Sequence, residues 1–143
     1  KNVQTMLDHP KTHCEVHTTI QLLNIFNLHD LYEWMKPFNQ MPKLPYHIWM
    51  DNPTWLHFSS VLPLELKQEA KQKLINYFSK NSSTDNEFNV RSQHILSYLD
   101  RAISEKQNMQ DLKQFQKLIR QFEKIRNTAP IETLVPELKA ILN

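Results

Sequence analysis

The most informative absence in this chain of 143 residues is glycine, of which it contains none. Glycine supplies the positive φ angles and the close backbone approach that a phosphate-binding P-loop and the dinucleotide-binding fingerprint both need. The sequence therefore excludes nucleotide binding through a glycine-rich loop.

Cysteine is nearly absent too, because Cys14 is the only one. A single thiol allows no internal disulfide, and no apolar run is long enough to span a membrane. No charged-then-apolar leader precedes the first element. We therefore expect a cytoplasmic protein without a membrane partner. The chain starts on Lys, which leaves open that it is a piece of a longer protein.

Charge of one sign does not dominate either. Lys and Arg together number 17 and Asp and Glu number 15, so the formal net charge is +2. Proteins that bind nucleic acid usually concentrate their basic residues on one face. Here the basic residues are dispersed among acidic ones, and we expect no nucleic-acid partner.

The stretch that organises the chain is residues 15–24, EVHTTIQLLN, whose alternation predicts a β-strand. One face suits packing under helices and carries Val16, Thr18, Ile20 and Leu22. The other face is polar and carries His17, Thr19 and Gln21. A polar stripe on a helix-covered sheet predicts a cavity or a site at the mouth of a barrel. An edge strand with one face in water explains the same pattern, so both interpretations stay open.

A second alternating run, residues 46–51, ends before Asn52 and Pro53. Its polar face is expected to carry His47, Trp49 and Asp51. Its apolar face is expected to carry Tyr46, Ile48 and Met50. Residues 30–36, between the two runs, have helical spacing. A helix between two strands, in place of a tight turn, predicts a βαβ unit with parallel strands.

Helical periodicity dominates the remainder of the chain. The expected helices cover residues 2–9, 63–78, 95–103, 112–122 and 136–142. Residues 79–87 are polar and are expected to form a loop. The pattern predicts an α/β fold that is helix-rich overall.

Three segments, taken in order, carry a family resemblance. The first, VHTTIQLLNIFNLHDLYEW, resembles a late βα unit in the barrel of radical S-adenosylmethionine (radical SAM) proteins, in the branch that includes the twitch and SPASM groups. The second, NPTWLHFSSVLPLELK, has that branch's proline, aromatic-leucine pair and Leu-Pro before a lysine-bearing helix. The residues that match this pattern are Pro53, Trp55, Leu56, Leu62, Pro63 and Lys67.

The third segment, FEKIRNTAPIETLVPEL, is similar to the closing segment of twitch-type members. Its matching positions are Glu123, Arg126, Pro136 and Glu137. The family more often has Asp where Glu123 stands.

The resemblance implies the C-terminal βαβ portion of a partial TIM barrel in residues 1–62 and a mainly helical C-terminal extension in residues 63–143. An intact enzyme of this kind holds a 4Fe-4S cluster on a CxxxCxxC loop and cleaves S-adenosylmethionine reductively. The resulting 5′-deoxyadenosyl radical abstracts a hydrogen atom from a substrate, a peptide or another small molecule. This chain lacks both that loop and the family's glycine-rich stretch. It is therefore expected to need the missing N-terminal, cluster-binding part of the barrel as its partner, unless it is a split or degraded relative.

The resemblance and the strand period together nominate site residues. The expected cofactor-binding residues for S-adenosylmethionine are His17, Thr19, Gln21 and Asn24. The expected substrate-binding residues are His47, Trp49 and Asp51. Asp51 has two interpretations, because an inward carboxylate can hold a ribose hydroxyl or a substrate amine but can also cap the loop at Asn52. No catalytic nucleophile-base-acid set is recognisable.

Two alternatives remain open. A metal site is suggested by the cluster of His9, His13, Cys14 and His17. Pro10 and the extended spacing of the strand work against it, and a histidine-rich loop explains the cluster equally simply. The alternative function is a small, mainly helical protein-interaction module without catalytic activity, in which the two strands are only a scaffold.

Overall fold

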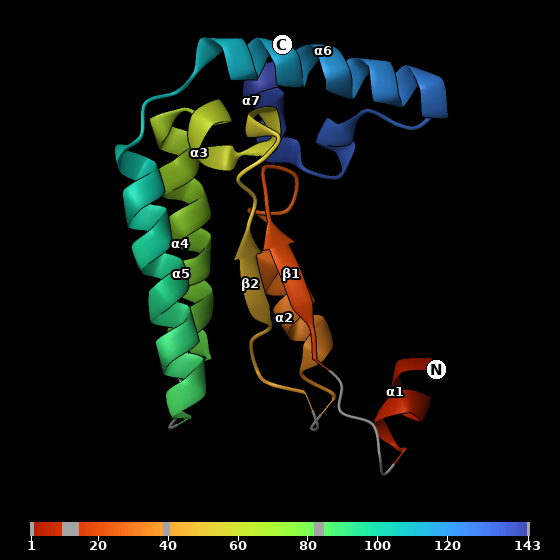
Figure 1. Ribbon diagram of the computed structural model, residues 1–143, viewed down its shortest axis with the longest axis vertical. Coiled ribbons are helices and arrows are strands. Elements are labelled where there is room, and N and C mark those ends of the chain that lie inside the picture. Colours follow the sequence, from red (N-terminus) through yellow and green to blue (C-terminus); the bar gives the residue numbers. More distant parts are fainter. Residues whose placement is uncertain (1, 10–14, 39–40, 82–84, 143) are drawn as a thin grey trace.

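The structure is a computed structural model that describes residues 2–9, 15–38, 41–81 and 85–142. It is helix-rich, with one small sheet of two parallel strands (Figure 1). His13 and Cys14, two members of the suggested metal cluster, lie outside the described residues.

The sheet is part of the predicted βαβ unit, formed by β1 (His17–Ile20), α2 (Leu28–Met35) and β2 (Tyr46–Trp49). The predicted parallel pairing is confirmed, with His17 opposite Tyr46 and Ile20 opposite Trp49. In Figure 1, α2 lies behind the two strands, while their front face carries no helix. The unit therefore has one covered and one open face.

β1 is shorter than the predicted strand because the chain turns after Ile20. The amide of Ile25 donates to the carbonyl oxygen of Gln21 at 3.1 Å, and the amide of Asn27 donates to that of Asn24 at 2.9 Å. These turns bury Leu22, Ile25 and Phe26 completely. Burial of apolar side chains thus outweighs continued extension of the strand.

The remaining elements are helical. The α-helices are α1 (Asn2–Leu7), α3 (Phe58–Val61), α4 (Leu64–Lys80), α5 (Asn86–Ser104), α6 (Met109–Arg126) and α7 (Lys139–Leu142). Three short 3₁₀ helices are η1 (Thr54–Leu56), η2 (Ile131–Thr133) and η3 (Pro136–Leu138). A helix is present at each predicted place, but α5 begins at Asn86, well before residue 95, and the expected loop over residues 79–87 is shorter because α4 ends at Lys80. The elements η1, α3 and η2 were not expected.

Helix boundaries follow from capping side chains. The Asp85 carboxylate accepts from the amides of Glu87 and Phe88 at the start of α5, and the Asn108 side chain does the same at the start of α6. The last turn of α6 leads into Asn127, whose φ of 50° and ψ of 44° are left-handed. Asparagine takes the position that glycine usually fills in other proteins.

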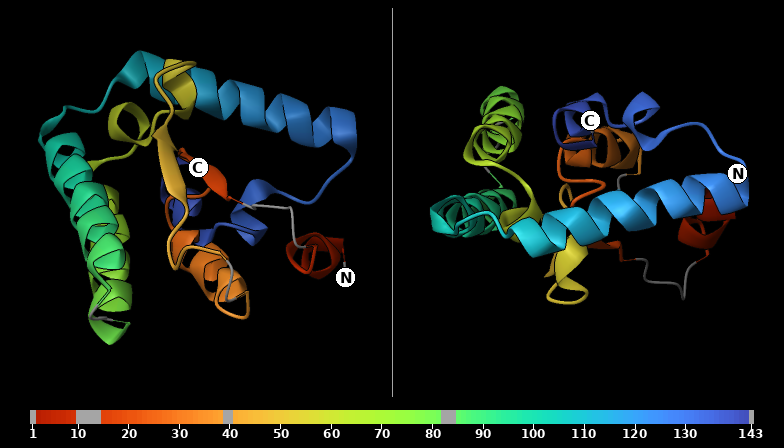
Figure 2. Two further views of the ribbon diagram at one scale, coloured as in Figure 1. Left: turned by 60° about the horizontal axis from the view of Figure 1, so that its bottom comes forward. Right: turned by 90° about the horizontal axis from the view of Figure 1, so that it is seen from above.

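One hydrophobic core runs through the molecule. It includes Ile20 on β1, Leu74 on α4, Leu99 on α5, Phe115 on α6 and Leu138 on η3. Residues 1–62 and 63–143 thus share this core. In both Figure 1 and Figure 2, α6 crosses beyond the carboxyl ends of the strands. Within the described residues, no helix combines the length and the apolar character needed to cross a membrane.

Candidate functional site

The open face of the sheet carries His17 and Thr19 from β1, as the strand period predicts. Because paired residues of parallel strands point the same way, Tyr46 and Ile48 of β2 share this face. The His17 and Tyr46 rings stack with centroids 5.1 Å apart. The Arg91 guanidinium of α5 also lies over the Tyr46 ring, 3.8 Å from its centroid. The open face is thus partly polar and partly aromatic.

The prediction of which face of β2 packs against the helices is wrong. Tyr46 and Ile48, expected on the helix-covered face, are 43% and 51% exposed. His47 and Trp49 point instead toward the helices. The reason is the register, which aligns His47 with Thr18 and Trp49 with Ile20 on the covered side. The two predicted sets of site residues therefore do not meet in one cavity.

His47 is held by a buried tyrosine. The Tyr32 hydroxyl lies 2.8 Å from His47 Nε2, and their rings meet edge to face. Burial, with a further contribution from Arg91, lowers the pKa of His47 to about 4. Burial also raises the pKa of Tyr32, which therefore keeps its proton and donates it. His47 is neutral at physiological pH and fastens β2 to α2.

Trp49 contacts α5. Its ring stacks on the Tyr98 ring, with centroids 3.4 Å apart and planes 13° apart. Burial raises the pKa of Tyr98, and the carboxylates of Glu105 and Asp51 add to that effect. Asp51 itself is exposed. Of the residues predicted on β2, His47 and Trp49 thus lie on its helix-covered side, and Asp51 follows the strand.

A groove of about 510 Å³ separates β2 from α5. Its lining includes Tyr46, His47, Trp49, Val90, Arg91 and His94. The Arg91 charge is already engaged, since this side chain donates to the Leu44 carbonyl oxygen at 2.6 Å and pairs with Glu87. The β2–α5 groove is therefore aromatic with little free charge.

A chain of polar side chains extends from Tyr98 and was not predicted. The Tyr98 hydroxyl is 3.0 Å from His57 Nε2, and Ser59 Oγ is 2.7 Å from His57 Nδ1. The Ser59 hydroxyl donates to the Glu105 carboxylate. Since that bond uses the only proton of Ser59, His57 Nδ1 donates to Ser59 Oγ, and in the neutral imidazole Nε2 then accepts from Tyr98. Such a directed chain can pass a proton between Tyr98 and Glu105.

Lys67, the lysine of the second resembling segment, is buried beside this chain at 1% exposure. Its Nζ donates to the carbonyl oxygens of Ala102, at 3.2 Å, and Glu105, at 2.7 Å. Burial lowers the pKa of Lys67, and the Glu105 charge partly opposes that effect. Carbonyl groups at a helix end lack partners within the helix. Lys67 thus joins α4 to the end of α5.

Asn24 acts locally on β1. Its Nδ2 donates to the Thr19 carbonyl oxygen at 2.8 Å, and its Oδ1 accepts from the Gln21 amide at 2.9 Å. Both ends of the carboxamide are therefore occupied by the backbone. Asn24 closes the end of the strand. Gln21 is partly buried and lies just after β1, outside the strand.

Periodicity in the sequence could indicate only part of this candidate site. The alternation found the residues on each strand, but His57 and Ser59 belong to a turn and a short helix without a period. Their only sequence signal is a group of polar residues within the otherwise apolar segment WLHFSSVL. Across residues 2–9, 15–38, 41–81 and 85–142, no group of three or more His, Cys, Asp or Glu residues could hold a metal ion.

Comparisons of this chain with protein-family models, with curated proteins and with solved structures found no match.

Proposed function

We propose that this chain is the C-terminal part of a radical SAM enzyme of the twitch and SPASM branch, to whose barrel β1 and β2 contribute two strands. The observation that carries the proposal is the parallel β1–α2–β2 unit with helices on one face only. Parallel sheets occur almost only with both faces covered, and a two-stranded sheet is marginal alone. Further strands of a barrel would enclose the open face.

The arrangement of the strand ends agrees with this proposal. Active sites of barrels lie at the carboxyl ends of the strands. The strands of this chain point toward α6, which crosses beyond their ends (Figures 1 and 2). A helical extension over the carboxyl ends would close such a site from above.

The proposed roles of individual residues follow the faces of the sheet. His17 and Thr19 would line the S-adenosylmethionine cavity, and Gln21 would lie at its rim. Asn24 would hold the end of β1 in position for them. Asp51, exposed just after β2, remains a proposed substrate contact, whereas His47 and Trp49 would support β2 from the helix side.

This chain alone cannot hold the 4Fe-4S cluster. Three cysteines hold it in the family, and this sequence has only Cys14, so the preceding part of the barrel would supply the cluster. The chemistry of reductive cofactor cleavage would belong to the assembled enzyme. The contribution of this chain would be to bind and orient the cofactor and the substrate.

The test begins with the reading frame upstream of Lys1. A segment with CxxxCxxC in frame supports the proposal, whereas an upstream stop codon followed by a start in the region of Lys1 would leave the interaction module as the better explanation. In the full-length protein, Thr19→Val should weaken S-adenosylmethionine binding about tenfold, because a charge-assisted or neutral hydrogen bond is lost.

The matched control is Thr18→Val, at the neighbouring position on the covered face. Cluster absorbance and circular dichroism report whether each variant is intact. If Thr18→Val weakens cofactor binding as much as Thr19→Val does, the open face is not the cofactor face.

A further inference from the structure

A groove of about 410 Å³ lies between the turn after β1 and the C-terminal end of α6. Its apolar lining includes Leu23, Ile119, Phe122, Ile131 and Leu134. Phe122 and Leu134 are 45% and 72% exposed. Large apolar side chains exposed beside a groove of this size are typical of a binding site. We call it the α6 groove.

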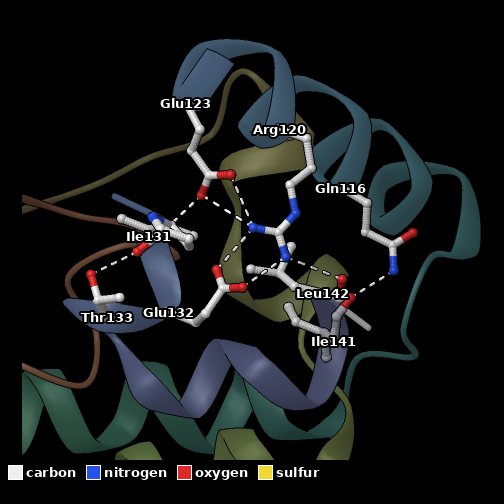
Figure 3. A network of polar contacts seen from close by, with 9 residues as sticks. Gln116, Arg120, Glu123, Ile131, Glu132, Thr133, Ile141 and Leu142 are labelled. Atoms are coloured by element: carbon white, nitrogen blue, oxygen red, sulfur yellow. Dashed lines mark hydrogen bonds and ion pairs between the residues drawn. The ribbon is translucent and has the colours of Figure 1, made fainter. Parts of the chain in front are cut away.

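The acidic residue of the α6 groove, Glu123, is already neutralised. Figure 3 shows its carboxylate turned toward Arg120. Arg120 Nη1 lies 2.9 Å from Glu123 Oε2, and the Ile131 amide donates to Glu123 Oε1 at 2.6 Å. Arg120 also pairs with Glu132, with Nη2 2.8 Å from Oε1. These ion pairs leave Glu123 little capacity to attract a cation.

Arg126 is the other charged residue in the lining. It is exposed, and within the described ranges no residue accepts a hydrogen bond from it or pairs with it. It lies in the last turn of α6, where the helix dipole disfavours anions. Arg126 must therefore supply the whole attraction for an anion in this groove.

From this combination we propose that the α6 groove binds a small organic acid. The carboxylate would pair with the Arg126 guanidinium, whose fork of N–H groups matches two carboxylate oxygens. The aliphatic body would lie against Phe122 and Leu134. Charge complementarity favours this ligand class, because Arg126 provides the uncommitted charge beside an apolar floor.

The α6 groove also lies near the carboxyl end of β1, because Leu23 follows that strand. In a barrel enzyme it would neighbour the substrate cavity. The binding proposal stands on the α6 groove alone and requires no radical chemistry, so either proposal can fail without the other.

The experiment is a titration of the whole isotope-labelled chain with octanoate, followed by amide chemical shifts. Octanoate should shift the amides of Leu23, Ala129 and Leu134. Octan-1-ol, which has the same body without charge, should bind about tenfold more weakly, since a charge-assisted hydrogen bond is lost. Acetate, which has the charge without the body, should not bind measurably.

Arg126→Gln should reduce octanoate affinity to that of octan-1-ol. The matched control, Lys124→Gln, removes an exposed cation of α6 that does not line the groove and should change nothing. Leu134→Ala, at an exposed position, should weaken both ligands. Equal binding of octanoate and octan-1-ol to the unmodified chain would overturn the proposal. Shifts confined to other cavities, or self-association that buries the groove, would overturn it equally.

Discussion

Trp49 stacks on Tyr98 at a centroid separation of 3.4 Å and thereby joins the sheet to α5. The contact explains why β2 turns its aromatic and histidine side chains toward the helices. A stacked aromatic pair adds about 1 kcal/mol beyond its buried area. On the open face of β2, Tyr46 contacts α5 only through the long side chain of Arg91, which lies over its ring, and Ile48 is 51% exposed. The orientation of the strand is therefore set by tertiary contacts.

The first prediction concerns that orientation. Trp49→Ala should lower the free energy of unfolding by about 2–4 kcal/mol, because it removes the stacked ring and its packing against the core. Ile48→Ala, at the neighbouring exposed position, should cost about 1 kcal/mol or less. Urea denaturation followed by circular dichroism measures both. A larger loss for Ile48→Ala would mean that β2 faces the other way.

The second prediction is a pH dependence from His47. Its folded-state pKa, about 4, lies below the ordinary value of 6.5. Between these values the unfolded chain binds the extra proton and the folded chain does not, so stability rises with pH. About 3 kcal/mol of stability, fully present above pH 6.5, should be lost as the pH falls to 4.

His47→Gln should flatten this dependence, because a glutamine oxygen can still accept from Tyr32 but does not titrate. His94→Gln, at an exposed position on α5, is the matched control. Denaturation midpoints at pH 7 and pH 4.5 give the comparison. An unchanged pH profile in His47→Gln would show that His47 is not the buried neutral histidine.

The third prediction concerns the buried lysine. Lys67→Met should destabilise the fold by about 1–3 kcal/mol, because two carbonyl oxygens at the end of α5 lose their donor. Lys71→Met removes a surface ion pair with Asp100 between the same two helices and should cost less than about 1 kcal/mol. Thermal unfolding of both variants separates the buried role from the surface one. Equal losses would contradict it.

The fourth prediction uses the left-handed end of α6. Asn127→Gly should stabilise or leave unchanged the folded state, because glycine adopts a φ of 50° without steric cost. Asn127→Ala should destabilise it by about 1 kcal/mol, since a left-handed alanine is strained. Calorimetric melting temperatures test the pair. An alanine variant as stable as the glycine variant would argue against the left-handed end.

Local patterns predicted much of this fold. The parallel βαβ unit followed from two alternating runs joined by a helix, and the long helices followed from apolar spacing. The side-chain caps at Asp85 and Asn108, by contrast, were not predicted. The resemblance to radical SAM proteins rests on three short segments of the sequence and stays a proposal.

The side of β2 that faces the helices could not be predicted from the run itself. His47 and Trp49 alternate with Tyr46 and Ile48, and both pairs contain an aromatic ring, so the hydrophobic pattern hardly distinguishes the faces. The decision comes from Tyr32 and Tyr98, which are distant in sequence. The polar chain through His57 and Ser59 has the same origin, since its partners come from α5 and the residue after it.

The side chain of Asn24 gives the sheet two unequal edges. By occupying the Thr19 carbonyl and the Gln21 amide, it imitates a neighbouring strand and stops pairing at that end of β1. In the described part of the chain, no side chain blocks the edge of β2 that faces away from β1 in the same way. Unpaired strand edges can pair with other strands, so Asn24 limits the addition of strands at the β1 edge but not at the β2 edge. Any strand that joins β1 must therefore end before Thr19 or displace Asn24.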